Sequence, residues 1–137
     1  MSSGDGNRLS EPAKARLALR VLRAYLRIRP RVHREPLPVY VARLGRPEDQ
    51  TDRRHPPFRL SRAVYRTLRV GRRQPTCLVN ALVLYRLLRE QGDDAELVIG
   101  LPESAADKDA HAWVELDGVD VGPPPGRSGH AELARFG

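Results

Sequence analysis

The sequence contains a single cysteine, Cys77, among 137 residues. One cysteine excludes an intramolecular disulfide, and it excludes a structural zinc site built from several thiolates. No uninterrupted apolar run approaches the roughly 20 residues that a membrane-spanning helix needs. Residues 1–10 contain no apolar signal region. We therefore expect a cytoplasmic protein, because a lone thiol stays free in that reducing compartment.

Lysine and aromatic residues are also scarce. The only lysines are Lys14 and Lys108, so 22 of the 24 basic residues are arginine, and the formal net charge is +7. Arginine forms bidentate contacts with carboxylates and phosphates, so such a surface can attract nucleic acid, anionic lipid or an acidic polypeptide. Codon bias and solvated helix faces explain the same composition without any ligand. With 5% aromatic residues, not interleaved with the arginines, a single-strand binder built on base stacking is disfavoured.

Apolar spacing predicts a first helix over residues 13–29. Ser10 is suited to cap it, and Pro30 ends it. One side of this helix carries an apolar stripe of Leu17, Val21, Tyr25 and Ile28, which Leu22 and Leu26 widen. The other side carries arginines with the same helical period: Arg16, Arg20, Arg23 and Arg27. The proline-rich stretch 30–57 receives no function, and residues 37–44 fit either a short helix or an extended segment.

Two more helices follow. Residues 58–70 have apolar residues at helical spacing, and residues 77–91 form a strong helix that Thr76 caps and Gly92 ends. The first turns of this last helix are apolar on nearly every side. Such a helix belongs in the middle of a domain.

Three strands are predicted after these helices, over residues 95–101, 110–116 and 119–122. Asp117-Gly118 is a two-residue hairpin signal between the last two. The tail to Gly137 is expected to be a loop or a short helix. Helices followed by an antiparallel sheet define an α+β domain.

Cys77 and His111 are the candidate pair for chemistry. The first residue of a helix lies among free backbone N–H groups at the positive end of the helix dipole, which lowers the pKa of a thiol. The same N–H groups can stabilise the oxyanion formed when a thiolate attacks a carbonyl. A histidine beside the thiol acts as base and then as acid. Taken singly, each residue is more often structural: an inert buried cysteine and a hydrogen-bonded histidine.

The combined pattern resembles the transglutaminase-like cysteine peptidases of lasso-peptide biosynthesis, which remove leader peptides and are similar to the C-terminal domain of the microcin-J25-processing protein. The resemblance is closest over residues 72–123. It is carried by Thr76-Cys77-Leu78, Ala81-Leu82, Leu87-Leu88-Arg89, Gly92, Leu97-Val98-Ile99-Gly100, Ala110-His111-Ala112-Trp113-Val114-Glu115 and Gly118.

The resemblance implies a transglutaminase-like, papain-like fold in which N-terminal helices precede a central helix carrying Cys77, packed on a small sheet carrying His111. We therefore divide the chain into a flexible N-terminus at 1–10 and one domain at 11–137, with a helical part at 11–70 and a catalytic core at 72–123. The resemblance also implies a thiol protease of antibiotic (lasso-peptide) biosynthesis that cuts the leader from a ribosomal precursor peptide. Cys77 is then the nucleophile and His111 the acid and base.

The implied partners are the precursor peptide, a small leader-binding protein and the ATP-using macrolactam cyclase. No nucleic acid, metal or cofactor is expected; His33, His55 and His130 lack ligand-like spacing. The arginine stripe of the first helix is a candidate docking face for the partner or the leader.

The third member of the expected triad departs from the family pattern. The family has an aspartate about twelve residues past the histidine, where this chain has Pro123. Asp120 is the nearest aspartate, and a simple hairpin pairs it with Glu115, roughly 13 Å along the strand from His111. Three alternatives stay open: a bulge or shifted register brings Asp120 closer, another acceptor orients His111, or the site works as a dyad.

Two other functions compete with the peptidase. One is a different acyl-transfer enzyme on the same scaffold, such as a transglutaminase or amidase. The other is a non-catalytic, arginine-rich binding module in which Cys77 and His111 are structural.

Overall fold

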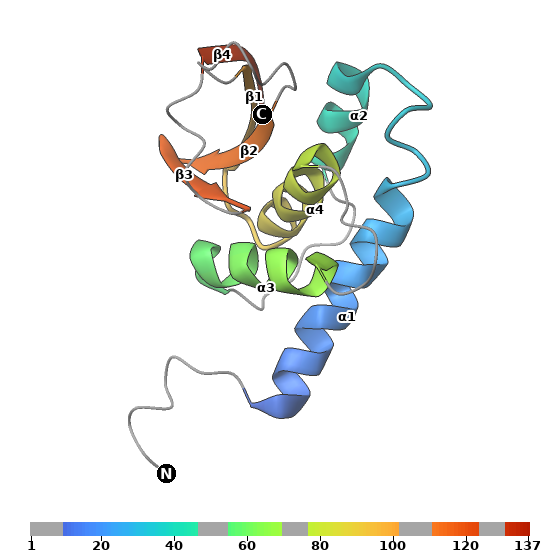
Figure 1. The fold of residues 1–137 in the computed structure, drawn as a ribbon, viewed down its shortest axis with the longest axis vertical. Coiled ribbons are helices and arrows are strands. Elements are labelled where there is room, and N and C mark those ends of the chain that lie inside the picture. The colour runs from blue at the N-terminus through green and yellow to red at the C-terminus, as the bar shows by residue number, and fades with distance from the viewer. Residues whose placement is uncertain (1–9, 47–54, 70–76, 102–110, 124–130) are drawn as a thin grey trace.

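Four helices precede a four-stranded antiparallel sheet in the computed structural model of the chain (Figure 1), which describes residues 10–46, 55–69, 77–101, 111–123 and 131–137. The helices are α1 (Glu11–Ile28), α2 (Leu37–Leu44), α3 (Pro57–Arg69) and α4 (Cys77–Glu90). The strands are β1 (Glu96–Leu101), β2 (His111–Leu116), β3 (Val119–Gly122) and β4 (Ala131–Phe136). The predicted α+β class is confirmed.

Helix α4 lies at the centre of the domain, as its apolar surface predicted. It contacts α1, α2 and α3 as well as β1 and β2, and residues 81–85 are all buried. Its C-terminal end is closed by two backbone bonds, from Asp93 N to Leu88 O (2.9 Å) and from Gly92 N to Arg89 O (3.1 Å). Gly92 has φ 91°, the left-handed conformation that this capping arrangement requires. The predicted helix end is confirmed.

Helix α1 begins at Glu11, two residues before the predicted start, and ends at Ile28, one residue before the predicted end. The Ser10 hydroxyl accepts a hydrogen bond from Ala13 N at 3.3 Å, and the helix stops before Pro30. Leu17 and Val21 are buried, but the predicted widening of the apolar stripe is wrong. Leu22 is 41% exposed and Leu26 is 67% exposed, because α3 and α4 cover only one side of α1.

Residues 37–44, for which a helix and an extended segment were both open, form the helix α2. Pro36 precedes the helix and Pro38 lies in its first turn, where the missing N–H groups cost no helical hydrogen bond. Tyr40, Val41 and Leu44 are buried, and α2 packs on α4. Tertiary packing therefore stabilises this two-turn helix, which is too short to be stable alone.

The sheet has the strand order β3-β2-β1-β4. The predicted hairpin is confirmed: Asp117 (φ 52°) and Gly118 (φ 79°) form the turn between β2 and β3. The expectation of a loop or helix at the C-terminus is wrong for residues 131–136, which form β4 and pair with β1. The segment contains helix formers, but the free edge of β1 offers a row of backbone hydrogen bonds that outweighs this local propensity.

Candidate active site

Cys77 is the first residue of α4, the position that the chemistry requires. The free N–H groups and the positive end of the helix dipole therefore lie at its backbone. The Cys77 side chain and the proposed cap, Thr76, lie outside the described part of the structure. α4 itself is held among three helices and two strands, so its N-terminal end is fixed relative to the sheet.

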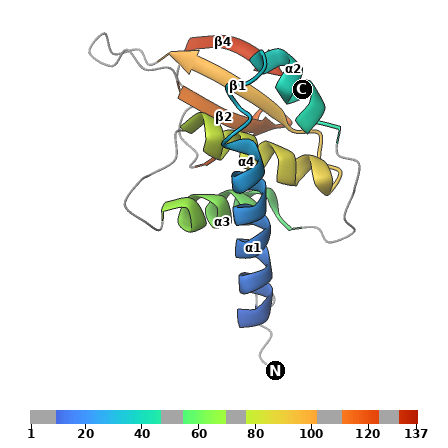
Figure 2. The same cartoon turned by 90° about the vertical axis from the view of Figure 1, so that its right-hand side faces the viewer.

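The topology brings His111 to the same end of the domain as Cys77. Only residues 91–95 connect α4 to β1, and β1 then runs back along α4 (Figure 2). The 14 residues of α4 span about 21 Å, and the six residues of β1 span about 20 Å. The end of β1 therefore lies near the start of α4. His111 pairs with Gly100 at that end of β1.

Side chains alternate along β2, and His111 shares a face with Trp113 and Glu115. Ala112 and Val114, on the other face, belong to the core cluster that contains the buried residues of α4. His111 itself is half-buried. By alternation His111 lies on the face of β2 opposite the one that packs on the buried residues of α4, so its pairing with the Cys77 thiol stays a prediction.

Trp113 and Glu115 form the fixed part of this face. Trp113 is 2% exposed, so it packs in the interior and does not line a cleft. Its indole Nε1 donates to Glu115 Oε2 at 2.8 Å, and Glu115 Oε1 lies 3.0 Å from Arg135 Nη1. Arg135 also pairs with Glu132 (2.7 Å) and Glu96 (3.1 Å). Its hydrogen bonds to Glu132 and Glu115 raise the pKa of Arg135 above its usual value.

Asp120 lies on β3 opposite Glu115, as the simple hairpin predicted. It is therefore four residues, about 13 Å, along β2 from the position opposite His111. The register does shift, but only after Asp120: Gly122 pairs with Val114 because Val121 is an extra residue. This bulge leaves the pairing of Asp120 unchanged. The Asp120 carboxylate accepts a hydrogen bond from Gly122 N at 2.8 Å and so stabilises the bulge.

Asn80 is a polar residue for which the sequence favours a structural role, as a hydrogen bonder on the face of the helix. It lies three residues, and so one turn, beyond Cys77 on the otherwise apolar α4. Its Oδ1 is enclosed and has no hydrogen-bond partner among the described residues. Buried polar atoms without a partner are rare in native structures. Its place one turn after Cys77 is visible in the sequence, but its enclosure depends on the elements packed around α4.

Comparison with known families agrees with this arrangement. The chain matches the transglutaminase-like superfamily over residues 15–135, and it belongs to that superfamily. The superfamily generally comprises cysteine-type enzymes, so its chemistry is that of acyl transfer through a thiol. Among curated proteins and among solved structures, none matches the chain. Within the described residues, no helix has both the length and the apolar character needed to cross a membrane.

Proposed function

We propose that this protein is a cysteine peptidase that removes the leader from a ribosomally synthesised lasso-peptide precursor. The observation that carries the proposal is the position of the chain's one cysteine at the first residue of the buried central helix. His111, the first residue of β2, pairs with Gly100 near the end of β1, and β1 runs back toward the start of α4. Membership of the transglutaminase-like superfamily supports thiol chemistry. The His-Ala-Trp-Val-Glu run (residues 111–115) supports the transglutaminase-like assignment, and the resemblance to the leader peptidases supports the choice of substrate.

The proposed reaction has two steps. The Cys77 sulfur attacks the scissile carbonyl carbon, and the N–H groups at the start of α4 stabilise the oxyanion. The C–N bond breaks, His111 delivers the thiol proton to the amine of the departing core peptide, and the leader remains as a thioester. Water, deprotonated by His111, then attacks the thioester and releases the leader as a free acid.

The third triad position is proposed to differ from the family pattern. Asp120 stays paired with Glu115 and binds Gly122 N, which supports the alternatives in which another acceptor orients His111 or the site works as a dyad. Removing an orienting aspartate lowers the rate of such sites greatly without abolishing it. Replacing Asp120 with Asn tests its assignment, since a catalytic Asp120 would cost several orders of magnitude in rate.

Within this proposal the partners are the precursor peptide, a small leader-binding protein that delivers it, and the macrolactam cyclase that acts afterwards. The resemblance supports all three. The localisation proposed is the cytoplasm, because the thiol must stay reduced.

The decisive experiment is mass spectrometry of a precursor incubated with the wild-type protein and with Cys77→Ala, each with and without the leader-binding partner. We expect wild type to give free leader acid and core peptide, and Cys77→Ala to give neither while retaining its fold by circular dichroism. Cleavage by the variant would end the proposal.

The pairing of Cys77 with His111 has its own test. Because the chain has one thiol, the rate of iodoacetamide alkylation against pH reports Cys77 alone. We expect half-maximal reactivity below the ordinary thiol pKa of about 8.5, and a shift to higher pH in His111→Ala. An unchanged profile in that variant means that the imidazole does not act on the thiol.

Two alternatives remain under test in the same assays. Efficient capture of a primary amine added during turnover favours acyl transfer, as by a transglutaminase, whereas release of the leader as a free acid favours hydrolysis. The non-catalytic binding module is favoured by the position of Asp120 away from His111. It predicts ordinary thiol reactivity and no cleavage.

A further inference from the structure

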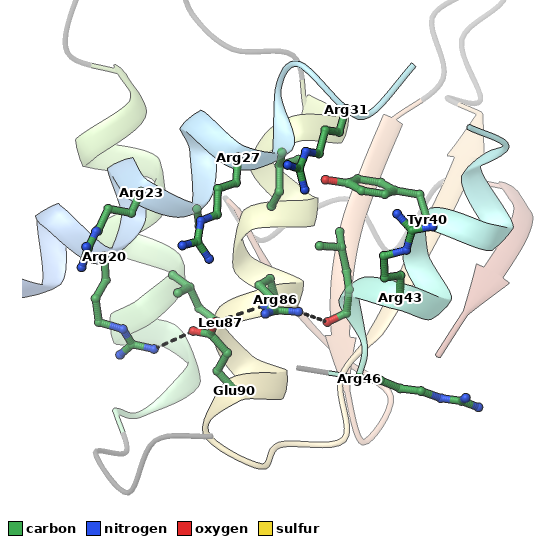
Figure 3. A pocket seen from close by; sticks show the side chains of 13 residues that line it. Arg20, Arg23, Arg27, Arg31, Tyr40, Arg43, Arg46, Arg86, Leu87 and Glu90 are labelled. Atoms are coloured by element: carbon green, nitrogen blue, oxygen red, sulfur yellow. Dashed lines mark hydrogen bonds and ion pairs between the residues drawn. The ribbon is translucent and has the colours of Figure 1, made fainter. Parts of the chain in front are cut away.

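A groove of about 530 Å³ lies between α1, α2 and α4, on the helical side of the domain (Figure 3). Its size is within the range of about 300–1,000 Å³ that is typical of ligand sites. Seven arginines line it: Arg20, Arg23, Arg27 and Arg31 from α1 and the turn after it, Arg43 and Arg46 from α2 and its end, and Arg86 from α4. Arg16, which the sequence analysis included in the basic stripe, does not line the groove. Figure 3 shows Arg27, Arg31 and Arg86 directed between the helices and Arg46 extending away at the rim.

The charge of this arginine groove is only partly neutralised. Glu90 pairs with Arg20 and with Arg86, each at 3.1 Å, and Arg86 also donates to Leu44 O at 3.2 Å. Glu35 pairs with Arg43 at 2.9 Å. These two carboxylates face seven guanidinium groups, all charged at neutral pH.

Four arginines of the groove are therefore available to a ligand. Arg23, Arg27, Arg31 and Arg46 form no ion pair with any described residue, and all four are exposed. Concave sites lined by one sign of charge concentrate the field and attract the opposite charge.

Apolar surface accompanies this charge. The floor of the groove contains Ala24, which is half-buried, and the buried Ile28, Leu44 and Leu87. On α1, next to the groove, Leu19 is 54% exposed and Leu26 is 67% exposed. Arg23, which lines the groove, follows Leu19 by four residues and precedes Leu26 by three, so its side chain borders both leucines. A ligand in the groove meets guanidinium groups, and a ligand that extends over α1 also meets these exposed leucines.

This mixture favours a polypeptide over a nucleic acid. The single aromatic ring of the groove, Tyr40, is buried, so bases have no platform on which to stack. Exposed leucines beside the groove match apolar side chains and have no counterpart in a phosphate backbone.

We propose that the arginine groove binds an acidic polypeptide segment, with its carboxylates on Arg23, Arg27 and Arg31 and its apolar side chains against the exposed leucines of α1. Arginine binds carboxylates in bidentate fashion, which fixes the orientation of the segment as well as attracting it. The inference does not depend on the chemistry at Cys77, since it concerns binding alone.

The test measures fluorescence anisotropy of a short labelled peptide containing glutamate and leucine in equal parts, mixed with the full chain at about 50 and 200 mM salt. Three probes accompany it: the same peptide with glutamine for glutamate, a single-stranded oligodeoxynucleotide of equal charge, and phosphatidylglycerol vesicles. The groove variant is Arg23→Glu/Arg27→Glu. The matched control is Arg62→Glu/Arg66→Glu on α3, which has the same spacing, exposure and change in charge.

The expected result is a loss of at least about tenfold in affinity for the glutamate–leucine peptide in the groove variant and less than about threefold in the α3 control. Should the groove variant unfold, the neutral pair Arg23→Gln/Arg27→Gln replaces it, with the same direction expected. Equal losses in both variants would mean that net charge alone attracts the peptide. That result, absence of peptide binding at low salt, or tighter groove-dependent binding of the oligonucleotide or the vesicles overturns the proposal.

Discussion

The side chain of Asn80 lowers the stability of the fold, because it leaves a buried oxygen unpaired within the described part of the structure, and it lies close to Cys77 in the sequence of α4. Its Oδ1 is enclosed without a partner among the described residues, one turn beyond Cys77. Leucine has nearly the same shape and no polar atom to leave unpaired. We expect Asn80→Leu to raise the melting temperature by a few degrees. We also expect it to slow precursor cleavage about tenfold, the effect of losing one hydrogen bond to the substrate.

The control for Asn80 is the alkylation rate of Cys77, which should stay at the wild-type value because the thiol and its helix are unchanged. A variant that melts higher and cleaves at the wild-type rate would show that Asn80 has no part in the reaction.

Ser61 gives a second prediction at this scale, on α3. Its side chain is 2% exposed, and its Oγ has no hydrogen-bond partner among the described residues. Alanine removes the unpaired hydroxyl and is the better helix former, so Ser61→Ala should stabilise the fold by about 0.5–1.5 kcal/mol in urea unfolding. Ser10→Ala, the same substitution at the cap of α1, should instead destabilise it by about 1 kcal/mol. Two changes of the same sign would contradict this assignment.

The places of Cys77 and His111 near the starts of their elements could be predicted from the sequence, because helix caps, turns and strand alternation are local signals. Helix α4 begins at Cys77 as predicted, and β2 begins at His111, one residue after the predicted start of the strand. The pairing of Asp120 with Glu115 also follows from the two-residue turn. The enclosure of Asn80 does not, because it depends on which elements surround α4, and the bulge at Val121 depends on the Asp120 carboxylate reaching Gly122 N.

At the scale of elements, Gln91 joins the end of α4 to the start of α3. It is 5% exposed. Its amide oxygen accepts from His55 N at 3.0 Å, and its amide nitrogen donates to His55 O at 2.8 Å and to the Asp93 carboxylate at 2.6 Å. Gln91→Ala removes the amide from these half-buried backbone groups, so we expect a loss of about 1–3 kcal/mol in the free energy of unfolding, measured in urea.

Gln91→Glu separates hydrogen bonding from packing. Glutamate fills the same space, but it cannot donate to His55 O and its charge lies against Asp93. The variant should be destabilised at least as much as Gln91→Ala. Near wild-type stability would mean that the side chain acts only by filling space.

Elements with strong local signals could be predicted, and elements held by distant partners could not. α1 and α4 carry caps and long apolar patterns, so their ends were predicted to within a residue or two. α2 has eight residues and two prolines in or beside its first turn, and only its packing on α4 decides that it is helical. β4 forms because the edge of β1 offers backbone groups to pair with. The residues of 131–136 alone do not show that such an edge is available.

Charge at the scale of the whole molecule is divided between the two sides of the fold. On the sheet, Arg135 is held by Glu132, Glu115 and Glu96. On the helical side, seven arginines share two carboxylates in one groove. Composition alone cannot distinguish a diffuse positive surface from a concentrated one, because the arginines of the groove come from three helices separated in the chain. Codon bias can explain the number of arginines in the chain, but it does not explain why seven of them line one groove.

The same composition makes the fold's response to alkaline pH unusually simple. Burial raises the pKa of Tyr40 and of Tyr85 above the usual value of 10.0, despite the nearby arginines that lower it. The unfolded chain therefore releases these protons first, so stability is intact below about pH 10 and falls as pH rises from there through the folded pKa values. Arginine stays charged throughout, and the chain has only two lysines, so few other groups titrate in this window.

We accordingly expect the melting temperature to be level from about pH 8 to 9.5 and to fall between about pH 10 and 11. The fall should be shallower in Tyr40→Phe and in Tyr85→Phe, and shallowest in the double variant, because phenylalanine has no proton to lose. Absorbance of tyrosinate, followed through the same unfolding transitions, assigns the effect to the phenols. A double variant that loses stability as steeply as wild type would place the alkaline sensitivity elsewhere than at the α2–α4 contact.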